Sequence, residues 1–194
     1  SFQSIVPAVD ESTDATDPVQ YVSELSVRKA AAVAKNNPLS VVIAADTVVF
    51  LDGVLLEKPA TADEACVMLR RLSGNTHTVC TGVAVAFRDE TRSFVQQTRV
   101  TFYDLPDSLI DWYVSTGEPM DKAGAYGIQG KGALLVKGIE GDYFNVVGLP
   151  VSPLYRLLLD MESALLAGVA AAQDPLERAV QYAMVGNFID FAVL

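Results

Sequence analysis

The chain has few of the residues from which metal centres and catalytic triads are commonly built. It contains one histidine, His77, and two cysteines, Cys66 and Cys80, among its 194 residues. A single histidine makes His-based metal sites and His-dependent triads poor explanations of any activity. The setting of His77 in "THTV" predicts a residue on the surface of a strand.

The two cysteines are too few for a disulfide framework. Free thiols are usual in intracellular proteins. No secretory signal precedes the first predicted strand. We therefore expect a cytoplasmic protein whose chemistry depends on acidic residues and a metal.

Positive charge is also scarce. Lysine and arginine number 14 against 24 aspartate and glutamate residues, and the net charge is -10. Affinity for a nucleic-acid backbone comes mainly from lysine and arginine contacts to phosphates, so we expect no polymeric nucleic-acid partner. A small anionic ligand is compatible with this charge, but it would need a few local lysines and a divalent cation between the acids and its phosphates.

Uninterrupted hydrophobic runs are short. Hydrophobic residues make up 51% of the chain, and the mean hydropathy is +0.28. However, Asp, Gly or Lys breaks the longest apolar runs well before the roughly 20 residues that a membrane span requires. We expect a soluble protein with no membrane partner, long enough to bury a core without metal or disulfide bonds.

Strand and helix patterns alternate along most of the chain. This alternation predicts an α/β fold with a mixed twisted sheet flanked by helices, followed by a helical C-terminal extension. The predicted strands lie at 1–9, 40–53 (a strand, a turn and a strand), 76–89, 91–105, 133–138 and 143–147. The predicted helices lie at 17–38, capped by Asp17, and at 62–75, 107–117, 153–173 and 174–194.

Two acids fall where predicted strands meet loops. Asp46 interrupts the apolar run "VVIAADTVV", and Glu11 follows the first strand in "VDEST". Ligands collect at the carboxyl ends of strands in open α/β sheets, so both acids are placed to hold a metal or to take a proton from water. The alternative is structural: Asp46 would cap a turn, and Glu11 would belong to an acidic loop leading to a helix.

Two lysines and a glycine-rich segment are candidates for phosphate binding. Lys29 and Lys58 are either phosphate clamps or solvated surface charges, and their spacing does not decide between these. Glycines at 124, 127, 130 and 132 suit a tight loop that brings backbone N–H groups near a ligand, although the P-loop spacing is absent. Gln129 in this loop could offer a donor and an acceptor to a base edge.

An ordered set of motifs resembles the Maf family of nucleoside triphosphate pyrophosphatases. The motifs are "VDES", "AADTVV", "LEKPATADEACVMLRRLSGNTHTVCTGVAV" and "TGEPMDKAGAYGIQGKGALLVKGIEGDYFNVVGLP". The resemblance covers residues 1–160, which we expect to form one domain with a fold like that of inosine triphosphate pyrophosphatase. Residues 161–194 would then be a helical extension or the start of a second domain.

The resemblance implies an activity and a role for each candidate residue. The family hydrolyses the α-β phosphoanhydride of nucleoside triphosphates with Mg²⁺ or Mn²⁺. On this model Asp46 is the proton acceptor and shares the metal with Glu11, and Lys29 and Lys58 neutralise the phosphates. Thr47 and Gln129 align with positions that govern base selection.

The "GAYGIQG" form is similar to the branch of the family that acts on dTTP, UTP and modified pyrimidine triphosphates. The family cleans the nucleotide pool, is linked to septum formation and is often dimeric, so a homodimer is one expectation.

Two departures from the family pattern leave other functions open. The family's first strand and its Ser-x-Ser-Pro-Arg-Arg phosphate loop have no counterpart here, which predicts weak or no turnover for a chain that lacks them. A nucleotide-binding regulator of cell division without catalysis is therefore an alternative. The tail, through Asn187 and Asp190, is similar to a short stretch of the damage-control phosphatases, a likeness that a plain amphipathic helix would also explain.

Overall fold

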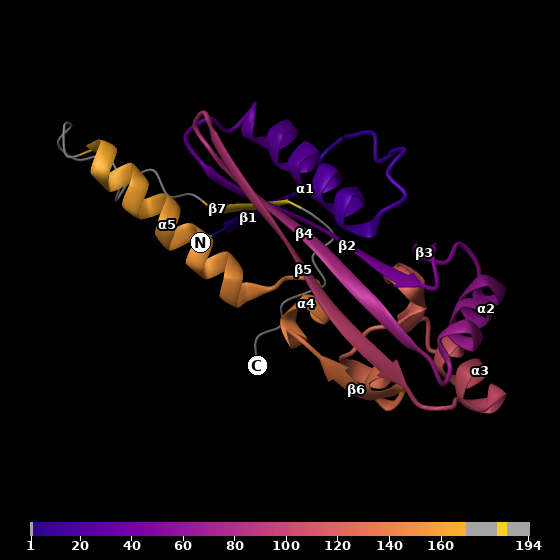
Figure 1. Cartoon of the computed structure of the whole chain (residues 1–194). Helices are drawn as coiled ribbons and strands as arrows, with labels where there is room; N and C mark the ends of the chain where they lie inside the picture. The colour runs from indigo at the N-terminus through magenta and orange to yellow at the C-terminus, as the bar shows by residue number, and fades with distance from the viewer. Residues whose placement is uncertain (1, 170–181, 186–194) are drawn as a thin grey trace. The chain divides into compact units, whose positions relative to one another are not determined.

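The fold is α/β, as predicted, and is built on a mixed seven-stranded sheet. The computed structural model describes residues 2–169 and 182–185. The strand order is β1-β7-β2-β4-β5-β6, and β3 pairs with β2 outside this path. Strand β7 is parallel to both β1 and β2 and lies between them (Figure 1). The β2·β3 and β5·β6 pairs are antiparallel.

The strands are β1 (Phe2–Ile5), β2 (Val41–Leu51), β3 (Val54–Leu56), β4 (Thr76–Phe87), β5 (Glu90–Phe102), β6 (Val136–Glu140) and β7 (Tyr182–Val185). The α-helices are α1 (Pro18–Ala34), α2 (Ala62–Leu72), α3 (Asp107–Ser115), α4 (Tyr143–Val147) and α5 (Val151–Val169). Short 3-10 helices are η1 (Glu118–Asp121), η2 (Ala123–Ala125) and η3 (Gly130–Leu134). The chain divides into two compact units, the first comprising 1–46, 82–95 and 150–194 and the second 47–81 and 96–149.

In the first unit, α1 begins and packs as its sequence predicts. The Asp17 side chain accepts a hydrogen bond from the backbone N–H of Gln20, and Pro18 occupies the first turn. The buried core of this unit joins the helix to the strands and consists of Ala30, Val33, Val42, Ala44, Ala84 and Ala86. A Cβ atom at Gly82 would collide with the backbone carbonyl of Val22. Only glycine therefore lets the helix approach β4 so closely.

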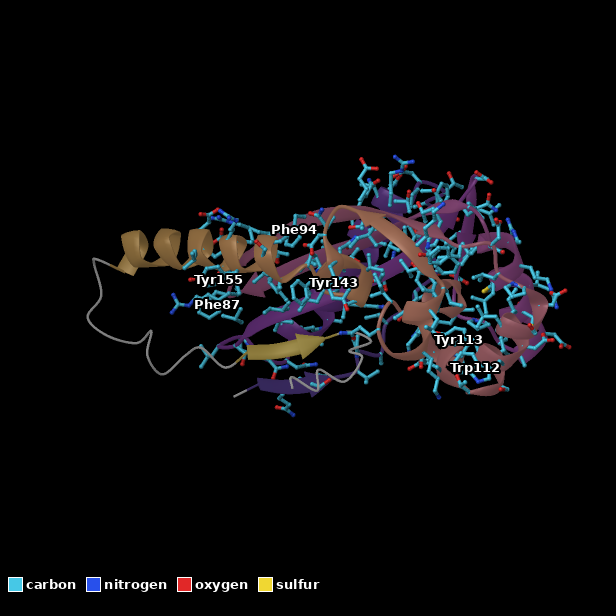
Figure 2. All side chains as sticks on the ribbon, turned by 90° about the horizontal axis from the view of Figure 1, so that it is seen from below. Phe87, Phe94, Trp112, Tyr113, Tyr143 and Tyr155 are labelled. Carbon is cyan, nitrogen blue, oxygen red and sulfur yellow. The ribbon has the colours of Figure 1, made fainter. Side chains whose placement is uncertain are left out.

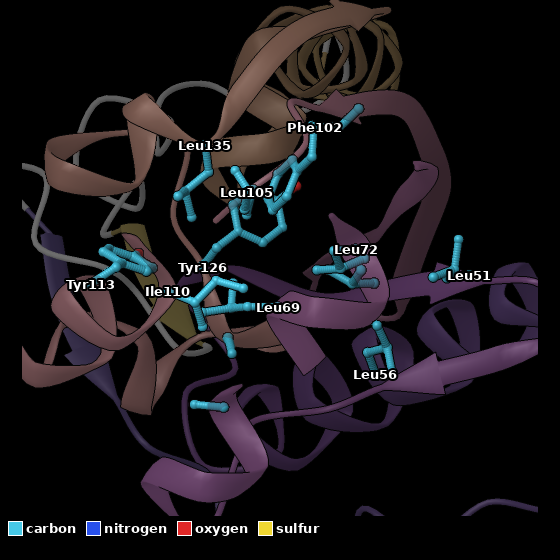
Figure 3. Packing of buried hydrophobic residues seen from close by; sticks show 14 of the residues in the cluster. Leu51, Leu56, Leu69, Leu72, Phe102, Leu105, Ile110, Tyr113, Tyr126 and Leu135 are labelled. Atoms are coloured by element: carbon cyan, nitrogen blue, oxygen red, sulfur yellow. The ribbon is translucent and has the colours of Figure 1, made fainter. Parts of the chain in front are cut away.

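In the second unit, helices α2 and α3 pack on a larger apolar core. Thr61 caps α2, and both Leu69 and Leu72 are fully buried. On α3 the neighbours Trp112 and Tyr113, both labelled in Figure 2, differ in burial: Trp112 is exposed and Tyr113 is buried. The close-up in Figure 3 labels leucines of this core together with Phe102, Tyr126 and Ile110.

His77 belongs to this core and does not lie on a strand surface, so that prediction was wrong. Its side chain is only 2% exposed. It forms edge-to-face contacts with Phe102 and Tyr126, with ring centroids 5.0 and 5.3 Å apart. Nε2 of His77 lies 2.7 Å from the Tyr126 hydroxyl. Burial lowers the pKa of His77 to about 4, so the imidazole is neutral at pH 7.

Two segments adopt a different structure from the one predicted. Residues 143–147 form the short helix α4, although "YFNVV" has a strand-like composition. The caps decide this outcome: Asp142 accepts from the N–H of Phe144, and Gly148 ends the helix with φ of 119°. The predicted strand at 133–138 is displaced, because η3 reaches Leu134 and β6 begins at Val136.

The predicted helix at 153–173 is present as α5, which the structure describes to Val169. Within the predicted helix at 174–194, the described residues 182–185 are the strand β7. The likeness to the damage-control phosphatases rests on Asn187 and Asp190, which lie outside the described residues. No helix in the described ranges is long and apolar enough to cross a membrane.

We expect the buried His77 to destabilise the fold in acid. Its pKa is lower in the folded chain, about 4, than the ordinary 6.5, so the unfolded chain binds more protons between these values. The His77 contribution is fully present above pH 6.5 and falls by about 2 kcal/mol at pH 5.

Urea unfolding of the wild type and of His77→Gln at pH 7.5 and 5 measures this effect. Carboxylates titrate alike in both proteins, so the free energy of unfolding should fall by about 2 kcal/mol more in the wild type. Equal losses would contradict a neutral, buried His77.

Candidate active site

A buried ammonium group joins the two predicted acids. Nζ of Lys29, on α1, lies 2.6 Å from Oδ1 of Asp46 on β2 and 3.0 Å from Oε1 of Glu11. The side chain of Lys29 is 3% exposed, that of Asp46 12% and that of Glu11 58%. Three of the predicted site residues therefore meet in the first unit, and a route from solvent reaches them on the Glu11 side.

The electrostatics of this cluster keep Lys29 charged. Burial opposes the charge, but attraction to Asp46 and hydrogen bonds to Asp46 and Glu11 outweigh it and hold the pKa of Lys29 above its usual value. The arrangement thus directs two carboxylates at one buried ammonium group.

The loop that carries Glu11 is tied to the same helix. Nη1 of Arg28 donates to the backbone carbonyls of Asp10 and Ser12, at 2.6 and 2.8 Å. The Asp10 carboxylate accepts from the N–H of Ser12. Neighbouring residues of α1 therefore hold both the loop backbone and the Glu11 side chain.

The sequence pattern suggested that Asp46 lies at the end of a strand. In the structure it lies inside β2. The strand continues through Thr47, Val48 and Val49 to Leu51, because these residues favour extended backbone. The chain reverses only at Asp52-Gly53, where φ is 49° and 80°. The β2·β3 hairpin thus has its turn six residues after the acid.

Asp46 and Glu11 are the candidate donors for a divalent cation held jointly with a ligand. Glu11 and Asp46 converge on one cation, the Lys29 ammonium, within 3.0 Å. In the described part of the chain no three His, Cys, Asp or Glu residues are close enough to bind a metal together. Mg²⁺ commonly takes one or two protein carboxylates and completes its shell with water and phosphate oxygens, so two acids are sufficient donors.

Thr47 belongs to a buried polar network in the second unit. Its Oγ1 lies 2.9 Å from Oγ1 of Thr81, which is fully buried. Thr81 in turn donates to the backbone carbonyl of Asn145, at 3.4 Å. The Asn145 amide group donates to the carbonyl of Val79 and to Oγ1 of Thr98. Thr47 is itself partly exposed.

The glycine-rich segment that carries Gln129 is held by Glu118. The Glu118 carboxylate accepts hydrogen bonds from the N–H groups of Lys131 and Gly132 and from the Tyr113 hydroxyl. Burial opposes ionisation of Glu118, but these bonds outweigh it and hold its pKa below the usual value. The N–H groups of residues 131 and 132 therefore bind the protein and not a ligand, which differs from our expectation. Gln129 is exposed.

Lys58 lies on an exposed loop of the same unit. The backbone carbonyl of its neighbour Glu57 accepts from the N–H of Gly124, at 3.1 Å, which fastens this loop to η2. Gly124 has φ of 67°, and a Cβ there would come within 2.9 Å of the Val49 side chain. Close packing of β2, the Lys58 loop and the glycine-rich segment therefore depends on this glycine.

Comparison with known proteins identifies the family. The family model described as Maf-like protein matches residues 1–161. This chain belongs to the Maf family.

Several relatives of this Maf chain have the same name. A dTTP/UTP pyrophosphatase from Geobacillus sp. (strain WCH70) is 54% identical over 156 residues, which are 80% of this chain and 84% of the relative. Proteins with this name from Bacillus cereus (strain B4264) and Bacillus cytotoxicus (strain DSM 22905 / CIP 110041 / 391-98 / NVH 391-98) are 48% and 47% identical. They match 81% and 84% of this chain and are themselves covered over 83% and 85% of their lengths.

The Maf chain also contains supporting residues that sequence reasoning missed. Glu118, Thr81 and Asn145 hold the segments that carry predicted site residues. Each lies inside one of the motifs quoted for the family resemblance, but nothing in its local pattern points to these contacts. The partners of Thr81 and Asn145 are 34 to 66 residues away in the sequence.

We expect Lys29→Met to destabilise the Maf chain strongly. The substitution leaves two converging carboxylates without their cation. The loss should be roughly 2–4 kcal/mol, below that of a fully buried pair because Glu11 is half exposed. Lys35→Met, at the exposed end of the same helix, should change stability by less than about 0.5 kcal/mol.

A double mutant tests the cause of this loss. In Lys29→Met/Asp46→Asn the repulsion is reduced, so the double variant should lose clearly less stability in chemical denaturation than the sum of the single variants. Additive losses would contradict a stabilising charge interaction between the two residues.

Proposed function

We propose that this chain is a metal-dependent nucleoside triphosphate pyrophosphatase. It would hydrolyse the α-β phosphoanhydride of dTTP, UTP and modified pyrimidine triphosphates and so clean the nucleotide pool. The observation that carries the proposal is the contact of Asp46 with the buried Lys29 ammonium beside Glu11. The names of the relatives, dTTP/UTP pyrophosphatase, support the substrate class.

The chemistry requires a base close to the attacking water. Water attacks the α-phosphorus, the bond from this phosphorus to the bridging oxygen breaks, and pyrophosphate leaves with the bonding electrons. The carboxylate of Asp46 accepts the proton of the water, a role for which its ionised form is needed. Lys29 supports that form by its charge and is also proposed to neutralise the phosphates together with Lys58.

The proposed cofactor is Mg²⁺ or Mn²⁺, held by Asp46 and Glu11 together with phosphate oxygens of the substrate. When bound, the cation supplies neutralisation of phosphate charge. The two carboxylates would hold the cation, and the Lys29 ammonium that both contact would keep them close together.

Base selection is proposed for Thr47 and Gln129. Both offer hydrogen-bonding groups at partly exposed or exposed positions of the second unit. Thr47 has a neighbour without a side chain, since an added Cβ at Gly148 would lie 4.0 Å from its Oγ1. The hydroxyl of Thr47 therefore has space on that side.

Other expectations from the family resemblance stay predictions. These are a cytoplasmic location, a homodimer, a link to septum formation and weak turnover without the Ser-x-Ser-Pro-Arg-Arg loop. The last of these determines how activity is measured. Assays should compare this chain with a version extended at its N-terminus by the first strand and loop of the family.

Asp46→Asn should abolish pyrophosphate release from dTTP and UTP. Loss of a general base lowers turnover by about 10² to 10⁴-fold, and the amide keeps the size of the carboxylate. Asp52→Asn is the matched control, because asparagine suits the turn at positive φ. Product analysis that separates monophosphate, pyrophosphate and phosphate gives the readout.

Retained turnover in Asp46→Asn would remove the assignment of the base. Saturable binding of dTTP or UTP with no monophosphate formed, even in the extended version, would favour the nucleotide-binding regulator.

Removal of divalent cations with EDTA should stop pyrophosphate release, and added Mg²⁺ or Mn²⁺ should restore it. Glu11 is proposed to bind the cation. Glu11→Gln should therefore raise the Mg²⁺ concentration that gives the half-maximal rate by about tenfold. Glu140→Gln, an exposed acid on β6, should leave this concentration unchanged. Full activity in EDTA would overturn the metal dependence.

A further inference from the structure

The loop that carries Glu11 has little apolar packing to hold it in place. Residues 6–16 form neither helix nor strand, and none of them is buried. Val6, the large apolar residue at the start of the loop, is 89% exposed. The side chain of Glu11 is 58% exposed. Hydrogen bonds to the rest of the protein therefore provide most of the order of this loop.

Side chains of helix α1 supply these hydrogen bonds. Nη1 of Arg28 donates to the backbone carbonyls of Asp10 and Ser12, at 2.6 and 2.8 Å. Four residues earlier on the helix, the Glu24 carboxylate accepts from the hydroxyl of Thr13 at 2.7 Å. Residues four apart lie on the same face of a helix, so one face of α1 binds the loop at several points.

The two backbone torsion angles of Glu11 lie between peptide groups that are both held. The peptide group before Glu11 includes the carbonyl of Asp10, which accepts from Arg28. The peptide group after Glu11 includes the N–H of Ser12, which donates to the Asp10 carboxylate at 2.9 Å. Fixing both peptide groups fixes φ and ψ of Glu11, and with them the direction of its Cα–Cβ bond. The charge of the guanidinium makes its two bonds stronger than those of a neutral donor.

This external support matters more for Glu11 than for Asp46. Asp46 lies inside β2, and pairing with neighbouring strands holds the backbone of β2. Glu11 lies in a loop, and an exposed carboxylate gains little from an ion pair, because the entropy of the side chain and the loop offsets the attraction. Its contact with Lys29 at 3.0 Å therefore depends on a loop that is already ordered.

We propose that Arg28 is a positioning residue that preorganises Glu11 to bind a divalent cation together with Asp46. This inference rests on the proposed function, because it takes the two acids to be the cation's protein donors. Arg28 acts through the loop backbone and contacts neither the cation nor the nucleotide. A carboxylate that is already directed loses less conformational entropy when the cation binds, so the affinity for the cation is higher.

The first measurement is the Mg²⁺ concentration that gives the half-maximal rate of pyrophosphate release in the extended version of the chain. Arg28→Met removes the donor and keeps a residue of similar helix propensity. It should raise this concentration about fivefold, the size of one net hydrogen bond, and leave kcat at saturating Mg²⁺ within about twofold of the wild type. An unchanged concentration, or a loss of kcat that saturating Mg²⁺ does not restore, would overturn the proposal.

The double variant Glu11→Gln/Arg28→Met shows whether Arg28 acts through Glu11. Glu11→Gln alone is expected to need about ten times more Mg²⁺. Without the carboxylate, Arg28 has no donor left to position, so the double variant should lie within about twofold of Glu11→Gln. Independent effects would multiply to about fiftyfold, and that result would contradict a positioning role.

Proteolysis tests the same inference without catalysis or a metal. A glutamyl endopeptidase cleaves after glutamate, and cleavage after Glu11 releases residues 1–11 of this chain, which mass spectrometry identifies. Cleavage requires the loop to open. In EDTA, the rate after Glu11 should be about fivefold higher in Arg28→Met than in the wild type. Equal rates would show that Arg28 does not hold the loop.

A matched control removes the same charge from the same unit. Arg92, on β5, pairs with Glu90 at 2.6 Å. Arg92→Met should leave both the Mg²⁺ concentration and the cleavage rate after Glu11 within about twofold of the wild type. If Arg28→Met does not fold, as judged by its melting temperature, Arg28→Ala removes the same donor with the highest helix propensity.

Failure of the proposed function has a different signature. If no nucleotide yields pyrophosphate, the catalytic proposal fails, and the cleavage assay still applies. The dissociation constant of Mn²⁺, measured by calorimetry in the presence of dTMP, then takes the place of the half-maximal Mg²⁺ concentration. The inference requires that Arg28→Met raise this constant about fivefold. An equal constant in the two proteins, or no binding of Mn²⁺ by the wild type, would overturn it.

Discussion

The ion pair between Lys29 and Asp46 is the constraint on which the first unit of this protein depends. A charge that is 3% exposed is stable only if its partners are close and well aligned. Helix α1 must therefore lie against β2 at the height of Asp46. Gly82 lets the helix lie close to the strand β4, and Arg28 holds the backbone of the Glu11 loop. The Lys29 ammonium thus links α1, β2 and the Glu11 loop.

The second unit also buries polar groups, but these are uncharged. Its buried polar groups, Thr81, Thr98 and Asn145, are arranged so that each proton has an acceptor, and they connect strands β4 and β5 to helix α4. The Oδ1 atom of Asn145 is buried with no hydrogen-bond partner, so the network is not fully satisfied. Such a group is retained at a cost in stability.

Most of the fold was predictable because local signals agree with the tertiary structure. Asp17 and Thr61 start helices where the pattern places them, and the β4–β5 hairpin follows from two strand-like runs joined at a short turn. Prediction failed where local signals conflict. The composition of "YFNVV" predicts a strand, but its caps and the contacts of Asn145 stabilise a helix. The local sequence predicts His77 on the surface, but the hydroxyl of Tyr126, 49 positions away, forms a hydrogen bond with it in the core.

The sequence by itself determined the fold class, the main helices and strands, and the acidic and basic residues from which a site could be built. These follow from hydrophobic periodicity and capping residues, which act over a few positions. Only the tertiary structure decided which of these residues meet. It joined Lys29 to Glu11 and Asp46, and Thr47 to Thr81. Contacts between residues 17 to 34 positions apart depend on how helices and strands pack, and no local pattern encodes that packing.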